Sequence, residues 1–183
     1  MQPRPRARWH VALIAAIGLL PVAVTAADVS EHQVKGAYLF NFIRLIDWPV
    51  AANAGEPLPV CVLGDSPVAA ALESLAATPV KGRRLVVRRL ATVAEAGACE
   101  VVFLSAGASS DLDGVVRTLP AGVLTVSEID TDERVWTVIN FVVEDDRVAF
   151  DVNVEAAARA QLSVSARLLS VARAVDGRKR RRD

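Results

Sequence analysis

The residue types that perform most enzyme chemistry are scarce in this chain of 183 residues. It contains two cysteines, Cys61 and Cys99, and two histidines, of which only His32 lies beyond the first 26 residues. A serine or cysteine triad needs a histidine base, and a zinc site needs three or four histidine or cysteine ligands. Neither site can be assembled from this inventory by the usual routes. We therefore expect a protein without catalytic residues, metal or cofactor.

Carboxylates occur in two clusters that raise the question of calcium. Neither cluster has the ligand order of a calcium-binding loop, in which oxygen ligands recur at alternate positions. We interpret both as solvated turns; they are Asp130, Asp132 and Glu133, and Glu144, Asp145 and Asp146.

Two runs of small and polar residues follow apolar stretches and could form a ligand site. Gly64-Asp65-Ser66-Pro67 follows residues 59–63, and Ser105 opens a similar run after residues 100–104. Open α/β sheets bind ligands at the carboxyl ends of their strands, with helix amides facing an anion. The runs lack the glycine spacing of a dinucleotide loop and the lysine of a phosphate loop. Two interpretations stay open: a ligand pocket formed by Gly64, Asp65, Ser66 and Ser105, or small residues that ease tight turns.

The first 26 residues have the three parts of a secretory signal peptide. A positive start precedes an uncharged run over residues 11–27, and Val24-Thr25-Ala26 offers a cleavage site of the Ala-x-Ala type. The run falls short of the roughly 20 residues that span a bilayer and is interrupted by Pro21. We predict export to the periplasm with cleavage near Ala26; an uncleaved anchor is the alternative. The positive charges come from Arg4, Arg6 and Arg8.

An even number of cysteines in an exported protein suggests a disulfide. A bond between Cys61 and Cys99 would close a loop for which the chain-entropy estimate is about 4 kcal/mol of stabilisation. Two free buried thiols are the alternative interpretation.

The charge of the chain is unevenly distributed. Residues 27–177 carry 13 basic and 20 acidic side chains, whereas residues 178–183 hold five basic residues and one acidic residue. A surface that binds nucleic acid must be basic because it contacts phosphates, so the acidic body argues against nucleic acid as a partner. The sequence predicts one domain over 27–177 and a basic, disordered tail over 178–183; contact of the tail with acidic lipid headgroups is the alternative.

Apolar runs alternate with helical patterns through the first two thirds of the domain. Helices are expected over residues 28–47, 67–76 and 111–119, the first ended by Pro49 and the second capped by Ser66. Strands are expected at 59–63, 84–88, 100–104 and 122–126, with a turn at Lys81-Gly82. Continuously apolar strands separated by helices are typical of a parallel sheet covered on both faces.

The last third has the pattern of an antiparallel hairpin followed by two short helices. Apolar residues alternate over 139–143 and 148–152, around a turn at Asp145-Asp146. Asn153 is expected to cap the first closing helix and Ser163 the second. The expected fold is a single three-layer α/β domain with a mainly parallel sheet of about five to six strands, a C-terminal antiparallel hairpin and flanking helices. The apolar stripe of the last helix is Val164, Leu168, Val171 and Val175.

Four aromatic residues lie within eleven positions: Tyr38, Phe40, Phe42 and Trp48. On a helix Phe40 and Phe42 point about 200° apart, so one face cannot bury all four. Burial in the core is one interpretation. The other is an exposed docking surface for a protein partner, formed by these four residues and Asn41.

The segment Lys35 to Pro49, with the sequence KGAYLFNFIRLIDWP, resembles the YfiR family of periplasmic regulators. The resemblance continues in order through residues 61–65, 81–83, 99–105, 139–141 and 147–153, and it ends in the helix at 165–169. It covers nearly all of the chain after residue 26. The helix motif that ends in Trp48-Pro49 is the most specific part, and the other segments support it because their order is right.

The resemblance implies a three-layer α/β domain, often dimeric, without catalytic activity. It also implies that the protein restrains an inner-membrane diguanylate cyclase by binding its periplasmic domain, and that an outer-membrane lipoprotein can relieve this restraint. Cys61 and Cys99 match a cysteine pair of the family, whereas a second pair that some relatives carry is absent from this sequence. The leading hypothesis is a non-catalytic periplasmic regulator that binds and inhibits a membrane-bound signalling protein, foremost a diguanylate cyclase in cyclic-di-GMP signalling.

Two other functions remain open. A periplasmic small-molecule binding or sensor protein, feeding a histidine kinase or another receptor, would use the loops that contain Asp65 and Ser105. An enzyme with a carboxylate-only site would rely on Asp65. The partners expected under the leading hypothesis are the periplasmic domain of an inner-membrane signalling protein, an outer-membrane lipoprotein and a second copy of the chain.

Overall fold

The computed structural model describes residues 30–48, 55–106, 108, 112–128, 136–175 and 178–179. The predicted signal peptide, most of the predicted basic tail and the acidic cluster at Asp130, Asp132 and Glu133 lie outside these residues. Within them, no helix has both the length and the apolar character needed to cross a membrane.

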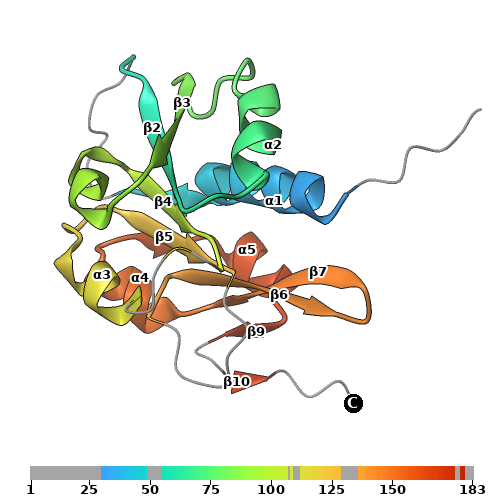
Figure 1. Ribbon diagram of the computed structural model, residues 1–183. Helices are drawn as coiled ribbons and strands as arrows, with labels where there is room; N and C mark the ends of the chain where they lie inside the picture. The colour runs from blue at the N-terminus through green and yellow to red at the C-terminus, as the bar shows by residue number, and fades with distance from the viewer. Residues whose placement is uncertain are drawn as a thin grey trace, which may run out of the picture.

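An eight-stranded sheet forms the centre of the domain (Figure 1). Its strands are β2 (Leu58–Leu63), β3 (Leu85–Leu90), β4 (Val101–Leu104), β5 (Leu124–Ser127), β6 (Ile139–Glu144), β7 (Arg147–Val152), β9 (Ala174–Val175) and β10 (Arg178–Lys179). The strands β3-β2-β4-β5-β6 run parallel in that order, and β7 pairs antiparallel with β6. The predicted parallel sheet and C-terminal hairpin are therefore confirmed. The sheet is wider than expected because the two-residue strands β9 and β10 extend it beyond β7.

Helices cover both faces of this sheet and complete the predicted three-layer α/β domain. On one face α1 (Glu31–Leu45), α2 (Val68–Leu75) and α5 (Ala166–Val171) contribute to the larger hydrophobic cluster. On the other face the 3-10 helix η1 (Val93–Ala98) and α3 (Leu112–Thr118) pack with a second cluster. α4 (Val154–Arg159) follows β7, and β1 (Ile46–Asp47) pairs with β8 (Ser163–Val164) in a separate small sheet.

α1 lies at the centre of the larger cluster, and both of its ends have a local cause. Ser30 Oγ accepts a hydrogen bond from the Gln33 amide while the Gln33 side chain accepts one from the Ser30 amide, which is a capping box. The helix ends earlier than the predicted residue 47 because Ile46 is extended and pairs with Val164. The sequence pattern marks where a helix is favoured, but the strand partner that ends it comes from 118 positions away.

The predicted cap of the last helix is wrong. Ser163 lies in β8, and Ser165 caps α5 by accepting a hydrogen bond from the Leu168 amide at 3.2 Å. The predicted apolar stripe does not form one buried face, since Leu168 is buried but Val171 is 63% exposed. The neighbouring cap is confirmed, because Asn153 Oδ1 accepts a hydrogen bond from the Ala156 amide at 2.9 Å.

Two tight turns occur where the sequence places them. Lys81 and Gly82 have φ angles of 51° and 76°, and Asp145 and Asp146 have φ angles of 51° and 56°. Two successive positive φ angles are the geometry of a type I′ hairpin turn, which aspartate and glycine tolerate better than most residues. The acidic cluster at Asp145 and Asp146 is thus a hairpin turn, as interpreted.

Candidate functional site

Five residues interlock at the amino edge of the parallel strands, and we call them the amino-edge clamp: Asp47, Trp48, Lys81, Arg83 and Glu100. Trp48 follows β1, and its indole Nε1 donates a hydrogen bond of 2.8 Å to the carbonyl of Gly122, just before β5. The Lys81 ammonium lies 5.6 Å from the centre of the Trp48 ring and 2.5 Å from Asp47 Oδ1, and it also donates to the Ile46 carbonyl. The Trp-Pro motif therefore fastens the end of α1 to the sheet.

Arg83 forms the second half of the clamp. Its guanidinium makes two hydrogen bonds of 2.6 Å to the Glu100 carboxylate and donates to the carbonyls of Glu56 and Pro57, each at 2.8 Å. The hydrogen bonds that Arg83 donates to Glu100 raise the pKa of Arg83, although partial burial opposes this. A two-pronged pair of this kind is stronger and more directional than a single ion pair. Arg83 thus connects the chain entering β2 with the chain entering β4.

A disulfide joins Cys61 on β2 to Cys99, with the two Cα atoms 6.0 Å apart. The predicted pairing is confirmed, and both residues are buried in the second hydrophobic cluster. Cys99 directly precedes Glu100, so the same short segment is held by a covalent bond and by the Arg83 ion pair. The disulfide and the ion pair therefore hold the short segment between η1 and β4 firmly against the rest of the sheet.

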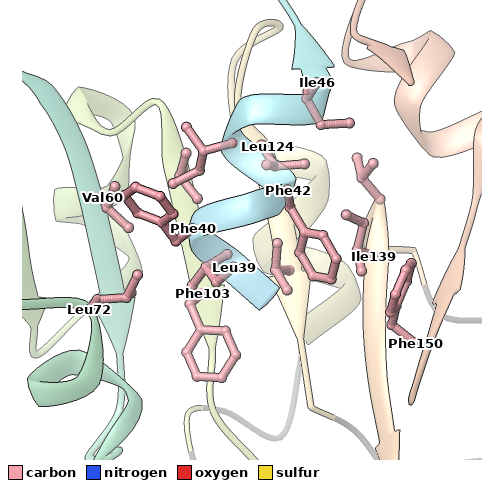
Figure 2. Packing of buried hydrophobic residues seen from close by; sticks show 14 of the residues in the cluster. Leu39, Phe40, Phe42, Ile46, Val60, Leu72, Phe103, Leu124, Ile139 and Phe150 are labelled. Atoms are coloured by element: carbon pink, nitrogen blue, oxygen red, sulfur yellow. The ribbon is translucent and has the colours of Figure 1, made fainter. Parts of the chain in front are cut away.

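Phe40 and Phe42 are buried on opposite sides of α1 (Figure 2). The Phe42 ring centre lies 4.7 Å from that of Phe150 and 5.4 Å from that of Phe141, on the β6-β7 hairpin. Phe40 points the other way, toward Val60 on β2. The surplus apolar side of the helix is therefore not exposed. The helix is packed between α2 and the hairpin, so more than one face of it is covered.

The five residues predicted to bind a partner do not share one surface. Tyr38 is half-buried, with its ring centre 5.5 Å from that of Phe150, and Trp48 is half-buried in the amino-edge clamp. Asn41 is exposed and donates to the Ala37 carbonyl at 3.0 Å. The solvent-facing side of α1 is a narrow strip that we call the outer stripe: Ala37, Asn41 and Arg44. The partner-binding role of these residues stays a prediction.

The predicted ligand loop lies at the carboxyl edge of β2 and β4, and its members are in contact. Gly64 has a φ of 86°, and a Cβ atom there would lie 2.3 Å from Ser105 Oγ. The Ser105 hydroxyl donates to the Leu63 carbonyl at 3.0 Å, and Ser66 Oγ accepts from the Val68 amide at 3.3 Å. Both hydroxyls are bonded to backbone and Gly64 is needed for a close approach, which favours the tight-turn interpretation. Asp65 is exposed, and its ligand role stays a prediction.

A buried ammonium lies at the same edge and was not singled out from the sequence. Lys35 is 5% exposed, and its Nζ lies 2.7 Å from Glu128 Oε2 and 2.5 Å from Glu31 Oε1. Burial lowers the pKa of Lys35, but the hydrogen bonds and charges of Glu128 and Glu31 outweigh this and leave the pKa above its ordinary value. The spacing of Glu31 and Lys35 is the one sequence signal for this pair. Lys35 thus ties the start of α1 to the end of β5.

In the described part of the chain, no group of three histidine, cysteine, aspartate or glutamate side chains is placed so that it could hold a metal ion. The carboxylates and ammonium groups described above are mainly engaged with one another. The arrangement therefore stabilises the fold and presents α1 as a rigid element between the two edges of the sheet.

Comparison with known proteins gives one family match. Residues 32–173 match the family described as YfiR/HmsC-like, and this range contains the amino-edge clamp, the disulfide, Lys35 and Glu128. A search of curated proteins finds no match.

Proposed function

Because the chain belongs to the YfiR/HmsC-like family, we propose that it is a non-catalytic periplasmic regulator that binds and inhibits a membrane-bound signalling protein, foremost a diguanylate cyclase. At the level of the family, membership implies a periplasmic regulator of diguanylate cyclases. The observation that carries the proposal is the extent of the match, which runs from α1 to the residue before β9. In this proposal residues 1–26 are a signal peptide cleaved near Ala26. The predicted disordered tail over 178–183 is shortened to 180–183, because Arg178 and Lys179 form β10 and pair with β9.

The outer stripe of α1 is the surface that we assign to the partner. α1 is fixed at its start by Lys35 and Glu128 and at its end by the bond from Trp48 to Gly122. A helix held in this way loses little conformational freedom on binding, so its exposed residues can contact a partner at low entropic cost. Asn41 of the outer stripe and the neighbouring, half-buried Tyr38 are the proposed contacts, whereas Phe40, Phe42 and Trp48 support the helix from within. Binding of a second copy and of an outer-membrane lipoprotein belongs to the same proposal.

Site-specific crosslinking in living cells tests this surface. A photoreactive amino acid at Asn41 is expected to capture an inner-membrane protein that carries a diguanylate cyclase domain, identified by mass spectrometry. The same amino acid at Arg88, an exposed residue of β3 at the sheet edge, is the matched control and should capture much less of it. Asn41 is preferable to Phe42 because a bulky group at the fully buried Phe42 would disrupt the core.

Deletion of the gene is the functional counterpart, and it should raise cellular cyclic-di-GMP. Unchanged cyclic-di-GMP together with equal capture at Asn41 and Arg88 would remove the proposal. Capture of a histidine kinase at Asn41 would instead support the alternative of a sensor protein that feeds such a receptor.

A further inference from the structure

A pocket of about 250 Å³ is lined by residues of α3, α4 and β5 and by the segments beside them. Figure 1 shows α3 and α4 close together at one end of the sheet. The walls of the pocket are mostly apolar, and neither an aspartate nor a glutamate is among the described residues that line it. The pocket lies away from α1 and from the predicted ligand loop, so neither of those sites accounts for it. The principal apolar residues are Val116, Leu119, Pro120, Val123, Val138 and Ala160.

Two arginines meet over one tryptophan at this pocket. The guanidinium carbon of Arg117 on α3 lies 4.3 Å from the centre of the Trp136 ring, and that of Arg159 on α4 lies 5.2 Å from it. Both arginines are exposed, and within the described residues neither forms an ion pair with a carboxylate. Stacking on the ring holds the guanidinium planes but does not use their N–H donors in the plane of the group. Among the described residues, two sets of donors therefore lack a carboxylate partner, in a domain whose overall charge is negative.

The wall of the pocket also carries a buried hydroxyl. Thr125 is 4% exposed, and its Oγ1 accepts a hydrogen bond from the Val138 amide at 3.0 Å. The hydroxyl hydrogen has no acceptor among the described residues. Thr125 can thus donate to a polar atom that enters the pocket, while its neighbours Val123 and Val138 offer only apolar contact.

We propose that this pocket binds a small organic anion that has an apolar body. The carboxylate of such a ligand accepts hydrogen bonds from Arg117 and Arg159, because guanidinium groups match a carboxylate with two parallel donors. The apolar body lies against Trp136 and the valines, where burial removes hydrocarbon from water. The pocket is partly open to solvent and has a volume of about 250 Å³, which suits the body of a small molecule. An acidic protein surface would meet the arginines but leave this volume unfilled. This binding is independent of the proposed regulatory function.

Titration of the full chain with octanoate tests the proposal by nuclear magnetic resonance of the ¹⁵N-labelled protein. Octanoate should shift the indole N–H resonance of Trp136 saturably, with Trp136→Phe giving the assignment. The uncharged analogue 1-octanol should bind at least tenfold more weakly, because it lacks the carboxylate. Equal binding of octanol would overturn the proposal.

The double variant Arg117→Gln/Arg159→Gln should weaken octanoate binding at least tenfold. The matched control is Arg84→Gln/Arg88→Gln, which removes the same charge from exposed positions before and within β3 and should leave the affinity unchanged. Equal affinity of the two double variants would overturn the proposal. Absence of a saturable shift with octanoate would do the same, including the case in which a glutamate-rich peptide shifts Trp136 instead.

Discussion

The two tryptophans of the described domain both have a cation over the ring, but they differ in the other groups around them. Each has a cation over its ring, Lys81 over Trp48 and Arg117 over Trp136. At Trp48 the cation is also bound to Asp47, and the indole donates to Gly122. At Trp136 two guanidiniums lack carboxylate partners among the described residues and border a pocket.

The comparison teaches that a cation stacked on an aromatic ring does not by itself mark a binding site. The stacking contributes only about 0.5–1 kcal/mol at an exposed position. The two sites differ in the partners of the cations. Lys81 donates to Asp47 and to the Ile46 carbonyl, whereas Arg117 and Arg159 have no carboxylate partner among the described residues. Substitutions in the amino-edge clamp are therefore expected to change the stability of the domain, and substitutions at the pocket are expected to change the affinity for a ligand.

The largest effect is expected where the clamp is reinforced covalently. The double variant Cys61→Ala/Cys99→Ala should lower the free energy of unfolding by about 4 kcal/mol, because the disulfide closes a loop between residues 38 positions apart. Urea denaturation of the oxidised protein and of the variant measures the difference. A loss below about 1 kcal/mol would mean that the Arg83–Glu100 pair holds this segment without the disulfide.

A second, smaller effect compares the two tryptophans directly. Trp48→Ala should lower the free energy of unfolding by about 3 kcal/mol, since it removes packing and the bond to Gly122, whereas Trp136→Ala should cost less than about 1 kcal/mol. Urea midpoints at equal slope give both values. Trp48→Phe is the control for the hydrogen bond alone and should cost about 1 kcal/mol. Equal losses for Trp48→Ala and Trp136→Ala would break the comparison.

The smallest expected effect is on the stability of the protein at acid pH, and it arises at the start of α1. The hydrogen bond from Lys35 lowers the pKa of Glu31 below its ordinary value of 4.5. The contribution of this pair to stability is therefore present above pH 4.5 and is lost as the pH falls through the lowered pKa. Glu31→Gln should reduce the loss of stability between pH 7 and pH 3, measured as the shift in urea midpoint. Because Glu31 is half-exposed, the change should be smaller than either effect above, and an identical pH dependence in both proteins would contradict it.

The strands and turns could be predicted from sequence because their causes are local. Continuous apolar runs produce β2 and β4, and Asp145 and Asp146 adopt the positive φ angles of the hairpin turn. The burial of α1 on more than one face could not be predicted, because helical periodicity identifies one apolar face but does not show which elements cover the others. Gly36 illustrates this: a Cβ atom there would lie 2.7 Å from the Ala71 Cβ, so the close approach of α1 and α2 needs a residue without a side chain.

The candidate sites were less predictable than the fold. Cys61 and Cys99 could be paired because the chain has only two cysteines. Arg117, Trp136 and Arg159 have no local pattern in common, and folding alone brings their side chains together. The residues of the Trp-Pro motif were conspicuous in the sequence, but Trp48 is occupied in holding α1 to the sheet.

The disulfide also bears on when the domain can mature. In a reducing compartment Cys61 and Cys99 remain thiols, so the chain lacks the constraint that this bond places on its unfolded ensemble. The reduced chain therefore has a smaller free-energy gap between its folded and unfolded forms. Oxidation to the disulfide raises the free energy of unfolding, so the domain gains its full resistance to unfolding only in a compartment where the bond can form.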